Sequence, residues 1–514
     1  MRRTFFFAAL LVFLLACFAC AAAEETDWQY EIIDRSGADP GVRIKRYNPA
    51  GDPPEILEVP ETLGGYPVKE LSSYVFATYR ELDNHQIETM TGSKVIVLPA
   101  EISKIGPDCF RFRELQEIRI ENGLFYETVD GVLFHKQTHT LVAYPRGKKN
   151  SLYVVPEGTQ VIGEHAFDTP ENLSEVRLAE SVRVIEKDAF CVFYLKLAIP
   201  EKVETIEPGA VIWASRFTSS SPRYRVTNGL LIDSEEKRLI SVPYSPAGEN
   251  NETRIISIPE GVEIIGEKAF YDVSCYEVNY PSTLKSIEDW NQYDQLGSGT
   301  LVFPENLESV GCNVRIWNLK ALVFPSSLRS IGEYSFSYGD TLETVVFREG
   351  LAFIGYNSFF RNQNLTTVVF PDSLKRIGRV SYTSLLDMEA AFDECPMLHA
   401  FVMPGSTAEA FCLKHSIPYH YTFEGRWQVD PAEAEEVLSL PGADQVMIRL
   451  ERRSLELSYI QGYFPRTERF SIEWKDGHLC MEGGYMDYDF PDEEHLILKL
   501  NEKQLHLTKT EESV

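Results

Sequence analysis

Three aspartates near the end of the chain have the type and spacing that come closest to a metal site. Asp487, Asp489 and Asp492 fall within the segment YMDYDFPDEEH. Carboxylate oxygens are ligands that calcium prefers. The segment lacks the glycine and the distal glutamate that complete an EF-hand loop. The three residues are therefore calcium candidates for which a solvated turn is the simpler interpretation.

Motifs that mark catalytic sites are absent from the sequence. It contains no H-E-x-x-H, no G-x-S-x-G and no phosphate-binding glycine loop. Seven cysteines follow Ala23, but they are far apart and include no C-x-x-C pair, so neither a zinc site nor a dithiol redox centre is indicated. We interpret them as small apolar core residues. We therefore expect a protein that is not an enzyme and that holds no cofactor.

One outward-facing side chain from each expected strand forms a candidate partner-binding row. In every strand, the residue before the last inward position faces out of the sheet. In the first half of the chain these residues are mixed, namely Val97, Arg119, Arg177, Ala198, Ser257 and Asn279. In the second half they are all valine, namely Val302, Val323, Val346, Val369 and Val402.

The valine row has three possible explanations. Neighbouring strands lie about 4.8 Å apart, so five valines span roughly 20 Å. A contiguous exposed apolar patch usually marks a partner site. Valine is also favoured in strands whatever it faces, and the C-terminal part of the chain could fold back over the row. The sequence leaves these three explanations open.

A repeated unit places these strands at regular intervals. Within residues 324–371, Leu342 and Phe347 recur 23 residues later as Leu365 and Phe370. A fixed period of this size predicts a solenoid, in which each unit buries its apolar side against the next. An Ile-Gly pair, a strand-ending proline and a phenylalanine recur at fixed phases. We predict about eleven coils of 21–23 residues, mostly β, with each phenylalanine on a short helical turn and pointing inward.

The unit L-x-x-V-x-F-P-x-x-L-x-x-I-G-x-x-x-F resembles the BspA-type leucine-rich repeat of bacterial surface proteins and some protist proteins. The resemblance covers roughly residues 28–422, and PETLGGYPV at residues 60–68 is similar to the family's usual first repeat. It implies an α/β leucine-rich-repeat solenoid. It also implies a role in adhesion and protein binding, and it brings no shared catalytic residues.

Two interruptions of the period resemble each other. Asp130-Gly131 and Asn228-Gly229 predict type I′ hairpin turns, and a third strand follows each hairpin. Such inserts suit a ligand contact, because loops carry function, but they also suit plain structure. Five segments follow from this pattern: an N-terminal β cap (24–55), the repeat array (56–403), β inserts near 121–150 and 223–250, a helix-strand cap (404–422), and a small β domain (425–514).

The last segment loses the period and alternates like a β meander. Hairpin turns are predicted at residues 475–478 and 500–503. Gly425-x-Trp427 and the strand spacing loosely resemble small lipocalin-like β-barrel domains of secreted bacterial proteins. That resemblance implies that the domain could hold a small apolar ligand or carry an unrecognised activity.

The first 23 residues predict export. Two arginines precede an apolar run from Phe5 to about Phe18, and Ala21-x-Ala23 permits cleavage before Glu24. In the alternative, Leu14-Leu15-Ala16-Cys17 resembles a bacterial lipobox, and Cys17 would carry a lipid anchor. No later apolar stretch is long enough to span a bilayer, so we expect no membrane insertion of the mature chain.

The chain of 514 residues is strongly acidic, with a formal net charge of -28. Such a surface repels nucleic acid phosphates, so we expect no nucleic acid partner. We predict a non-catalytic binding or adhesion scaffold, secreted or held at the cell surface, that recognises a protein or a surface polymer. The alternatives are a ligand-carrying C-terminal domain with the repeats as a targeting arm, and a purely structural envelope protein.

Overall fold

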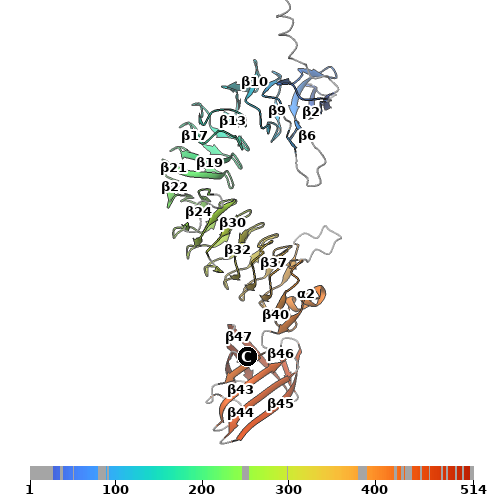
Figure 1. Ribbon diagram of the computed structural model, residues 1–514, viewed down its shortest axis with the longest axis vertical. Helices are drawn as coiled ribbons and strands as arrows, with labels where there is room; N and C mark the ends of the chain where they lie inside the picture. The colour runs from blue at the N-terminus through green and yellow to red at the C-terminus, as the bar shows by residue number, and fades with distance from the viewer. Residues whose placement is uncertain are drawn as a thin grey trace, which may run out of the picture. The chain divides into compact units, whose positions relative to one another are not determined.

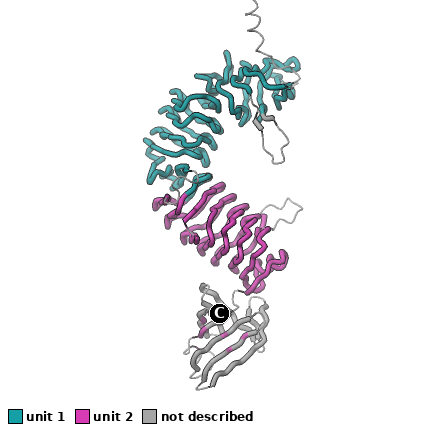
Figure 2. The backbone as a smooth tube through the Cα atoms, in the orientation of Figure 1, with its two compact units in different colours: residues 1–249, 264–274 teal, residues 250–263, 275–514 magenta. Residues whose placement is uncertain are grey.

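The chain divides into two compact units (Figure 2). Unit 1 comprises Met1–Glu249 with Ile264–Ser274, and unit 2 comprises Asn250–Glu263 with Cys275–Val514. The computed structural model describes residues 27–34, 37, 39–49, 51–78, 88–89, 92–245, 254–297, 299–379 and 391–421, together with the strands of the C-terminal domain. The signal peptide and Cys17 lie outside the described residues, and their assignment stays a prediction.

Paired strands begin unit 1. Strands β1 (Trp28–Ile33) and β2 (Gly41–Tyr47) pair antiparallel, as their alternation predicts. The rings of Trp28 and Tyr47 lie 4.4 Å apart and both contact Phe76. The strands that complete this region are β4 (Thr62–Leu63), β5 (Tyr66–Leu71), β6 (Ala77–Thr78), β7 (Glu88–Thr89) and β9 (Lys104–Ile105).

Parallel strands of the L-x-x-V-x-F phase form the first face of the repeats (Figure 1). In unit 1 they are β3 (Ile56–Glu58), β8 (Val95–Leu98), β10 (Glu117–Ile120), β14 (Leu152–Val154), β17 (Glu175–Arg177), β19 (Phe190–Ile199) and β21 (Val211–Ser219). In unit 2 they are β25 (Ile255–Ser257), β28 (Glu277–Asn279), β31 (Thr300–Val302), β34 (Ala321–Val323), β36 (Thr344–Val346), β38 (Thr367–Val369), β40 (His399–Val402) and β41 (Tyr419–Tyr421).

Shorter parallel strands of the Ile-Gly phase form the second face. In unit 1 they are β15 (Val161–Ile162), β18 (Val184–Ile185), β20 (Thr205–Ile206) and β26 (Ile264–Ile265). In unit 2 they are β29 (Ser286–Ile287), β32 (Ser309–Val310), β35 (Ser330–Ile331), β37 (Phe353–Gly355) and β39 (Arg376–Gly378). The structure is thus a mostly β solenoid, as predicted.

The third side of each coil differs in detail from the prediction. It consists of hydrogen-bonded turns, such as Ala166 N to Gly163 O at 3.1 Å, where short helical turns were expected. In some coils strands occupy this side, namely β16 (Phe167–Asp168), β27 (Val273–Cys275), β30 (Gln292–Gln295) and β33 (Arg315–Trp317). The repeated phenylalanines nevertheless point inward as predicted, because all are 8% exposed or less. They are Phe76, Phe110, Phe167, Phe190, Phe270, Phe336, Phe359 and Phe392.

A left-handed residue recurs three positions after the Ile-Gly isoleucine. Its φ lies between 53° and 61° in coil after coil, a region that non-glycine residues seldom occupy. This turn redirects the chain toward the buried phenylalanine two residues later. The residues are Tyr74, Asp108, His165, Asp188 and Lys268 in unit 1, and Trp290, Asn313, Tyr334 and Asn357 in unit 2.

Both inserts have the predicted hairpins. Asp130-Gly131 and Asn228-Gly229 have positive φ at both positions, and the flanking residues pair directly, as a type I′ turn requires. The third strand of each insert then pairs parallel with the second face. The strands are β11 (Tyr126–Val129), β12 (Val132–His135) and β13 (Thr140–Ala143), and β22 (Tyr224–Thr227), β23 (Leu230–Asp233) and β24 (Arg238–Ser241).

A helix and a closed barrel follow the repeats. Helix α2 (Thr407–His415) begins at Ser406, whose hydroxyl accepts from the backbone N–H of Glu409 as predicted for an N-cap. The eight antiparallel strands of the barrel are β42 (Gly425–Val429), β43 (Ala443–Glu451), β44 (Ser454–Gln461), β45 (Phe464–Lys475), β46 (His478–Met481), β47 (Gly484–Asp492), β48 (His495–Leu500) and β49 (Lys503–Lys509). Lys475 pairs with His478 and Leu500 with Lys503, which confirms both predicted hairpins.

Candidate binding surface

Six strands of unit 2 carry the candidate partner-binding row. They form one parallel sheet in the order β31-β34-β36-β38-β40-β41. The middle residues of the first four strands, such as Leu301 and Val345, are 5% exposed or less. Successive residues of a strand alternate between faces, so the residues beside them point out of the sheet.

The strand registers align four of the valines directly. Val302 pairs with Val323, Val323 with Val346, and Val346 with Val369. Val302 is 58% exposed, and the other three are half-buried. The predicted alignment is therefore confirmed for these four, while their contact with a partner stays a prediction.

Val402 was assigned to this row wrongly. It is fully buried, and the residue that pairs with Val369 is Phe401. The segment HAFVM is apolar in both phases, and a shift of one residue moves a side chain to the other face. Phe401 in turn pairs with His420, whose ring lies 5.8 Å away. The row thus continues through two aromatic rings that sequence reasoning missed.

The outward positions of this sheet carry no Asp, Glu, Lys or Arg. We call Val302, Val323, Val346, Val369, Phe401 and His420 the apolar row. Six side chains on neighbouring strands span roughly 24 Å. A parallel second row carries no Asp, Glu, Lys or Arg either. It consists of Thr300, Ala321, Thr344, Thr367 and His399.

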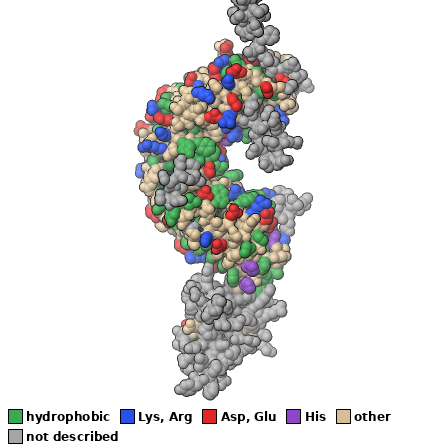
Figure 3. Space-filling view, viewed as in Figure 1, with side chains coloured by type: hydrophobic (Ala, Val, Ile, Leu, Met, Phe, Trp, Pro, Cys, Tyr) green, Lys and Arg blue, Asp and Glu red, His purple; other side chains and the backbone are tan. Residues whose placement is uncertain are grey.

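The same face of unit 1 is charged. Arg119 donates to Glu117 at 2.8 and 2.7 Å, and Arg177 donates to Glu175 at 2.8 Å. These contacts hold exposed side chains along the strands, and acidic and basic groups are interspersed over this unit in Figure 3. The mixed character predicted for the first half of the row is confirmed, because Arg119 pairs with Val97 and Arg177 with Ala198.

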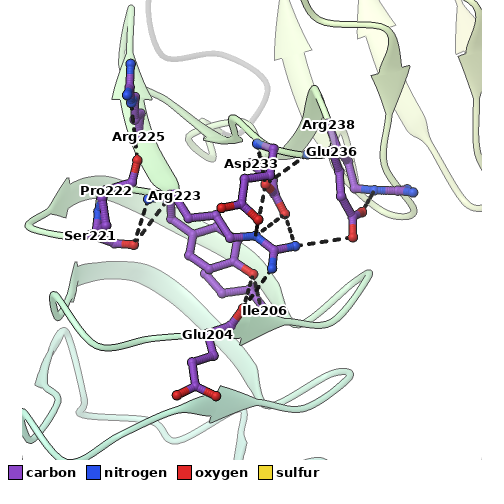
Figure 4. Close-up of polar contacts among 11 residues, drawn as sticks. Glu204, Ile206, Ser221, Pro222, Arg223, Arg225, Asp233, Glu236 and Arg238 are labelled. Atoms are coloured by element: carbon purple, nitrogen blue, oxygen red, sulfur yellow. Dashed lines mark hydrogen bonds and ion pairs between the residues drawn. The ribbon is translucent and has the colours of Figure 1, made fainter.

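A buried ion pair organises the second insert (Figure 4). The Arg223 guanidinium donates to both carboxylate oxygens of Asp233, at 2.7 to 3.1 Å, and Asp233 is 2% exposed. Arg223 also donates to the backbone oxygen of Glu204 at 3.0 Å, in the preceding coil. The Tyr224 hydroxyl accepts from the backbone N–H of Ile206 at 2.8 Å.

These contacts favour the structural interpretation of the second insert. The hydrogen bond and ion pair to Asp233 raise the pKa of Arg223. The Asp233 carboxylate also accepts from the backbone N–H groups of Glu235 and Glu236 in the turn. The polar groups that could have met a ligand here are therefore engaged in holding the insert to its coil.

An exposed aromatic patch on unit 1 was missed by sequence reasoning. Phe193 and Tyr194 are 44% and 46% exposed, and the Phe193 ring stacks on Trp213 at 4.2 Å. Tyr244 lies edge-on to both exposed rings. The pairing of β19 with β21 is irregular between Cys191 and Leu195, so Phe193 and Tyr194 leave the repeat phase. The sequence signal that could have indicated this patch was the pair of adjacent aromatic residues at a coil corner.

The candidate metal and thiol chemistry finds no support among the described residues. No group of three His, Cys, Asp or Glu residues there is placed to hold a metal ion. The side chains of Asp487, Asp489 and Asp492 on β47 lie outside the described set, so the calcium assignment stays a prediction. Burial raises the pKa of the thiols of Cys109, Cys191, Cys275 and Cys412 to about 12. These thiols are therefore uncharged core groups at neutral pH.

Two remaining expectations concern the barrel and the membrane. The barrel side chains that the structure describes as buried are Val429, Ile448, Leu455, Leu457, Leu498, Leu505 and Leu507. An eight-stranded barrel has room for packed side chains or for one small ligand, so the lipocalin-like resemblance and the apolar ligand stay predictions.

Within the part of the chain that the structure describes, we find no helix with the length and apolar character to cross a bilayer.

The fold and the outward rows define a parallel-strand solenoid in which one unit has a sheet whose outward rows lack Asp, Glu, Lys and Arg. The BspA-type leucine-rich repeat region matches residues 146–226, 248–314, 293–389 and 314–410 in six copies. These segments are similar to that repeat, as their residue pattern had implied.

Solved structures resemble the chain over most of its length. A leucine-rich cell surface protein from Faecalibacterium prausnitzii is 19% identical, with a TM-score of 0.42, and the match covers 77% of this chain and 98% of that one. The pneumococcal vaccine antigen PcpA is 17% identical, with a TM-score of 0.36 and coverage of 78% and 99%. A leucine-rich repeat protein from Eubacterium ventriosum is 16% identical, with a TM-score of 0.37 and coverage of 72% and 92%. No curated protein matches the chain.

Proposed function

We propose that this chain is a non-catalytic binding scaffold, secreted or held at the cell surface, that recognises a partner protein through the apolar row of unit 2. One observation carries the proposal. Six outward side chains align in register on neighbouring strands, and none of them is Asp, Glu, Lys or Arg. On a chain with a net charge of -28, such a face is a place where another surface can approach without desolvating ions.

A protein suits this face better than a charged polymer. Valine and phenylalanine give up water at a gain of about 25 cal/mol per Å² of apolar area buried. A few anchoring side chains usually carry most of the binding energy, and aromatic residues are enriched among them. Phe401 and its neighbour Val369 are the natural anchors, because they join the valines to the aromatic end of the row. The Arg2-Arg3 start and the apolar run of the first 23 residues support export.

The double variant Val346→Lys/Val369→Lys tests the proposal. Both side chains face outward from the middle of the row, so lysine can be accommodated there without entering the core. We expect the variant to fold, with an unchanged circular dichroism spectrum. We expect it to lose at least tenfold in capture of a protein from extracts of host or bacterial surfaces, because a buried unpaired charge opposes binding.

Ala198→Lys is the matched control. Ala198 occupies the same phase on β19 of unit 1 and is exposed. The Ala198→Lys variant should capture the same protein as the unsubstituted chain. Equal capture by all three proteins would exclude the apolar row as the contact surface. Capture that survives protease treatment of the extract would identify a surface polymer as the partner, and the absence of any captured molecule would favour a purely structural envelope protein.

A further inference from the structure

A pocket of about 200 Å³ opens on unit 1. The turn that follows β9 forms one wall, and the turn that precedes β16 forms another. The end of β13, in the first insert, also lines it. The volume is below the roughly 300–1,000 Å³ of pockets that take drug-sized ligands, and it is several times the ~30 Å³ that one water occupies. The pocket therefore suits one small molecule.

Two buried polar atoms in this pocket have no hydrogen-bond partner. They are Oδ1 of Asp108, whose side chain is 6% exposed, and Nδ1 of His165. The two atoms face each other at 4.0 Å, which is too long for a direct hydrogen bond. The Asp108 carboxyl group also forms a hydrogen bond with Tyr74. Unpaired buried atoms nevertheless cost free energy and usually have a reason, and a ligand that pairs the two atoms would remove this cost.

The position of the first insert explains why the space is open. Asp108 and His165 occupy the same left-handed position of the repeat. The first insert lies between them in the sequence and has no residue at that position. In the neighbouring coils of unit 1 a cation fills the corresponding space. There Lys268 lies over Gly209, which has no side chain, and its ammonium contacts Asp188 at 2.5 Å. His165 is too short to make the equivalent contact with Asp108.

The charges that line the pocket are largely paired among themselves. Arg111 donates to both oxygens of Asp168, at 2.6 and 3.2 Å, and its guanidinium lies 3.6 Å from Asp108 Oδ1. Arg146 makes only long hydrogen bonds of 3.4 Å to backbone oxygens. Two guanidinium groups thus face two buried carboxylates, with the half-exposed Glu164 at the mouth. A balanced set of donors and acceptors favours a neutral ligand over an ion.

We propose that this pocket binds one neutral sugar residue. A hydroxyl group both donates and accepts, so one hydroxyl between Asp108 and His165 can donate to the carboxylate and accept from the imidazole. Further hydroxyls can accept from Arg146. The Cys109 thiol in the wall donates to the Ser72 backbone oxygen at 3.0 Å, and burial raises its pKa to about 12. This thiol is therefore protonated at neutral pH and is not a nucleophile.

Ligand-observed NMR on the full chain tests this proposal. The probes are the methyl glycosides of glucose, galactose, mannose and N-acetylglucosamine, with glucuronate and glucosamine as charged counterparts. We expect saturation transfer to at least one neutral glycoside. Asp108→Asn should weaken its binding about tenfold, because asparagine tolerates the left-handed backbone but removes the charge from the hydrogen bond. Ala143→Leu, which fills the pocket from β13, should abolish binding.

His139→Asn is the matched control, because His139 is an exposed left-handed residue of the same insert that lies outside the pocket. It should bind like the unsubstituted chain, and the melting temperatures of all variants should show that they fold. Transfer to glucuronate or glucosamine alone would overturn the neutral class. Transfer to no probe, or transfer that Asp108→Asn and Ala143→Leu leave unchanged, would overturn the site and leave water as its occupant. Val346→Lys/Val369→Lys should not affect sugar binding, so this proposal and the proposed function fail separately.

Discussion

The first faces of the two units share a backbone and differ in chemistry. Both are parallel sheets whose inward residues are buried and mostly leucine, isoleucine and valine. In unit 1 the outward positions carry arginine and glutamate in pairs, whereas the outward positions of the six-stranded sheet of unit 2 carry valine, threonine, phenylalanine and histidine. The repeat constrains the residue types at the inward positions of each strand and leaves the residue types at the outward positions free to vary. Binding specificity can therefore change along the array without a change of fold.

If the two units differ only in their outward faces, truncating a core phenylalanine should destabilise both units to the same extent. This loss of stability is the largest expected effect. Phe190 in unit 1 and Phe359 in unit 2 are both fully buried. Phe190 stacks on Phe167 at 4.9 Å, and Phe359 lies between Phe336 and Phe392 at 5.7 and 5.0 Å. Phe190→Ala and Phe359→Ala should each cost about 3–5 kcal/mol, from lost burial and a cavity. Hydrogen exchange of the coils around each site measures the loss.

Phe193→Ala is the internal control for this pair. Phe193 belongs to the same strand as Phe190 but is 44% exposed, so its truncation should change protection little. If Phe359→Ala proved as mild as Phe193→Ala, the stacked phenylalanines would not be the common core of both units. The comparison would then rest on the outward faces alone.

Breaking a charge pair with a buried carboxylate should reduce local stability more than breaking an exposed pair, although both pairs belong to unit 1. Asp233→Asn removes the buried carboxylate partner of Arg223 and leaves the more exposed Glu235 and Glu236 at 3.7 and 3.2 Å. We expect a loss of about 1.5–3 kcal/mol in local stability, because neutral hydrogen bonds replace charge-assisted ones. Glu175→Gln removes the partner of Arg177 on the surface and should cost less than about 0.5 kcal/mol. Equal losses in hydrogen exchange would show that the exposed pairs are also structural.

Much of the fold could be predicted because the repeat makes local signals agree. The Ile-Gly pair, the strand-ending proline and the buried phenylalanine recur at one phase, and each coil repeats the same argument. The prediction was wrong where the local signal was ambiguous. In HAFVM both alternations are apolar, and only the pairing of Val369 with Phe401 identifies the outward residue. The prediction of helical turns on the third side was also wrong, because left-handed residues end each turn after one hydrogen bond.

The polar pocket of unit 1 could not have been predicted in this way. Its walls come from different coils, as the contact between Arg111 and Asp168 across 57 residues shows. The repeat phase places Asp108 and His165 in one column, but it does not give the 4.0 Å gap between their side chains. That gap depends on how the end of the first insert packs between the two turns. Contacts of this kind follow from tertiary packing, which a single sequence does not encode in any local pattern.

The smallest expected effect concerns pH and the charged face of unit 1. The hydrogen bond from Arg119 lowers the pKa of Glu117 below its ordinary value of 4.5. A carboxyl with a lowered pKa stabilises the fold above its unfolded pKa, and this contribution is lost as the pH falls through the folded pKa. Arg119→Val copies the apolar row onto unit 1. It should return the pKa of Glu117 toward 4.5 in a carbon-13 NMR titration and remove this loss below pH 4.5. Because both side chains are exposed, stability at neutral pH should change by no more than about 0.5 kcal/mol. A much larger loss on urea unfolding would mean that the charges of unit 1 hold its sheet together, and the two faces would then differ in stability as well as in what they can bind.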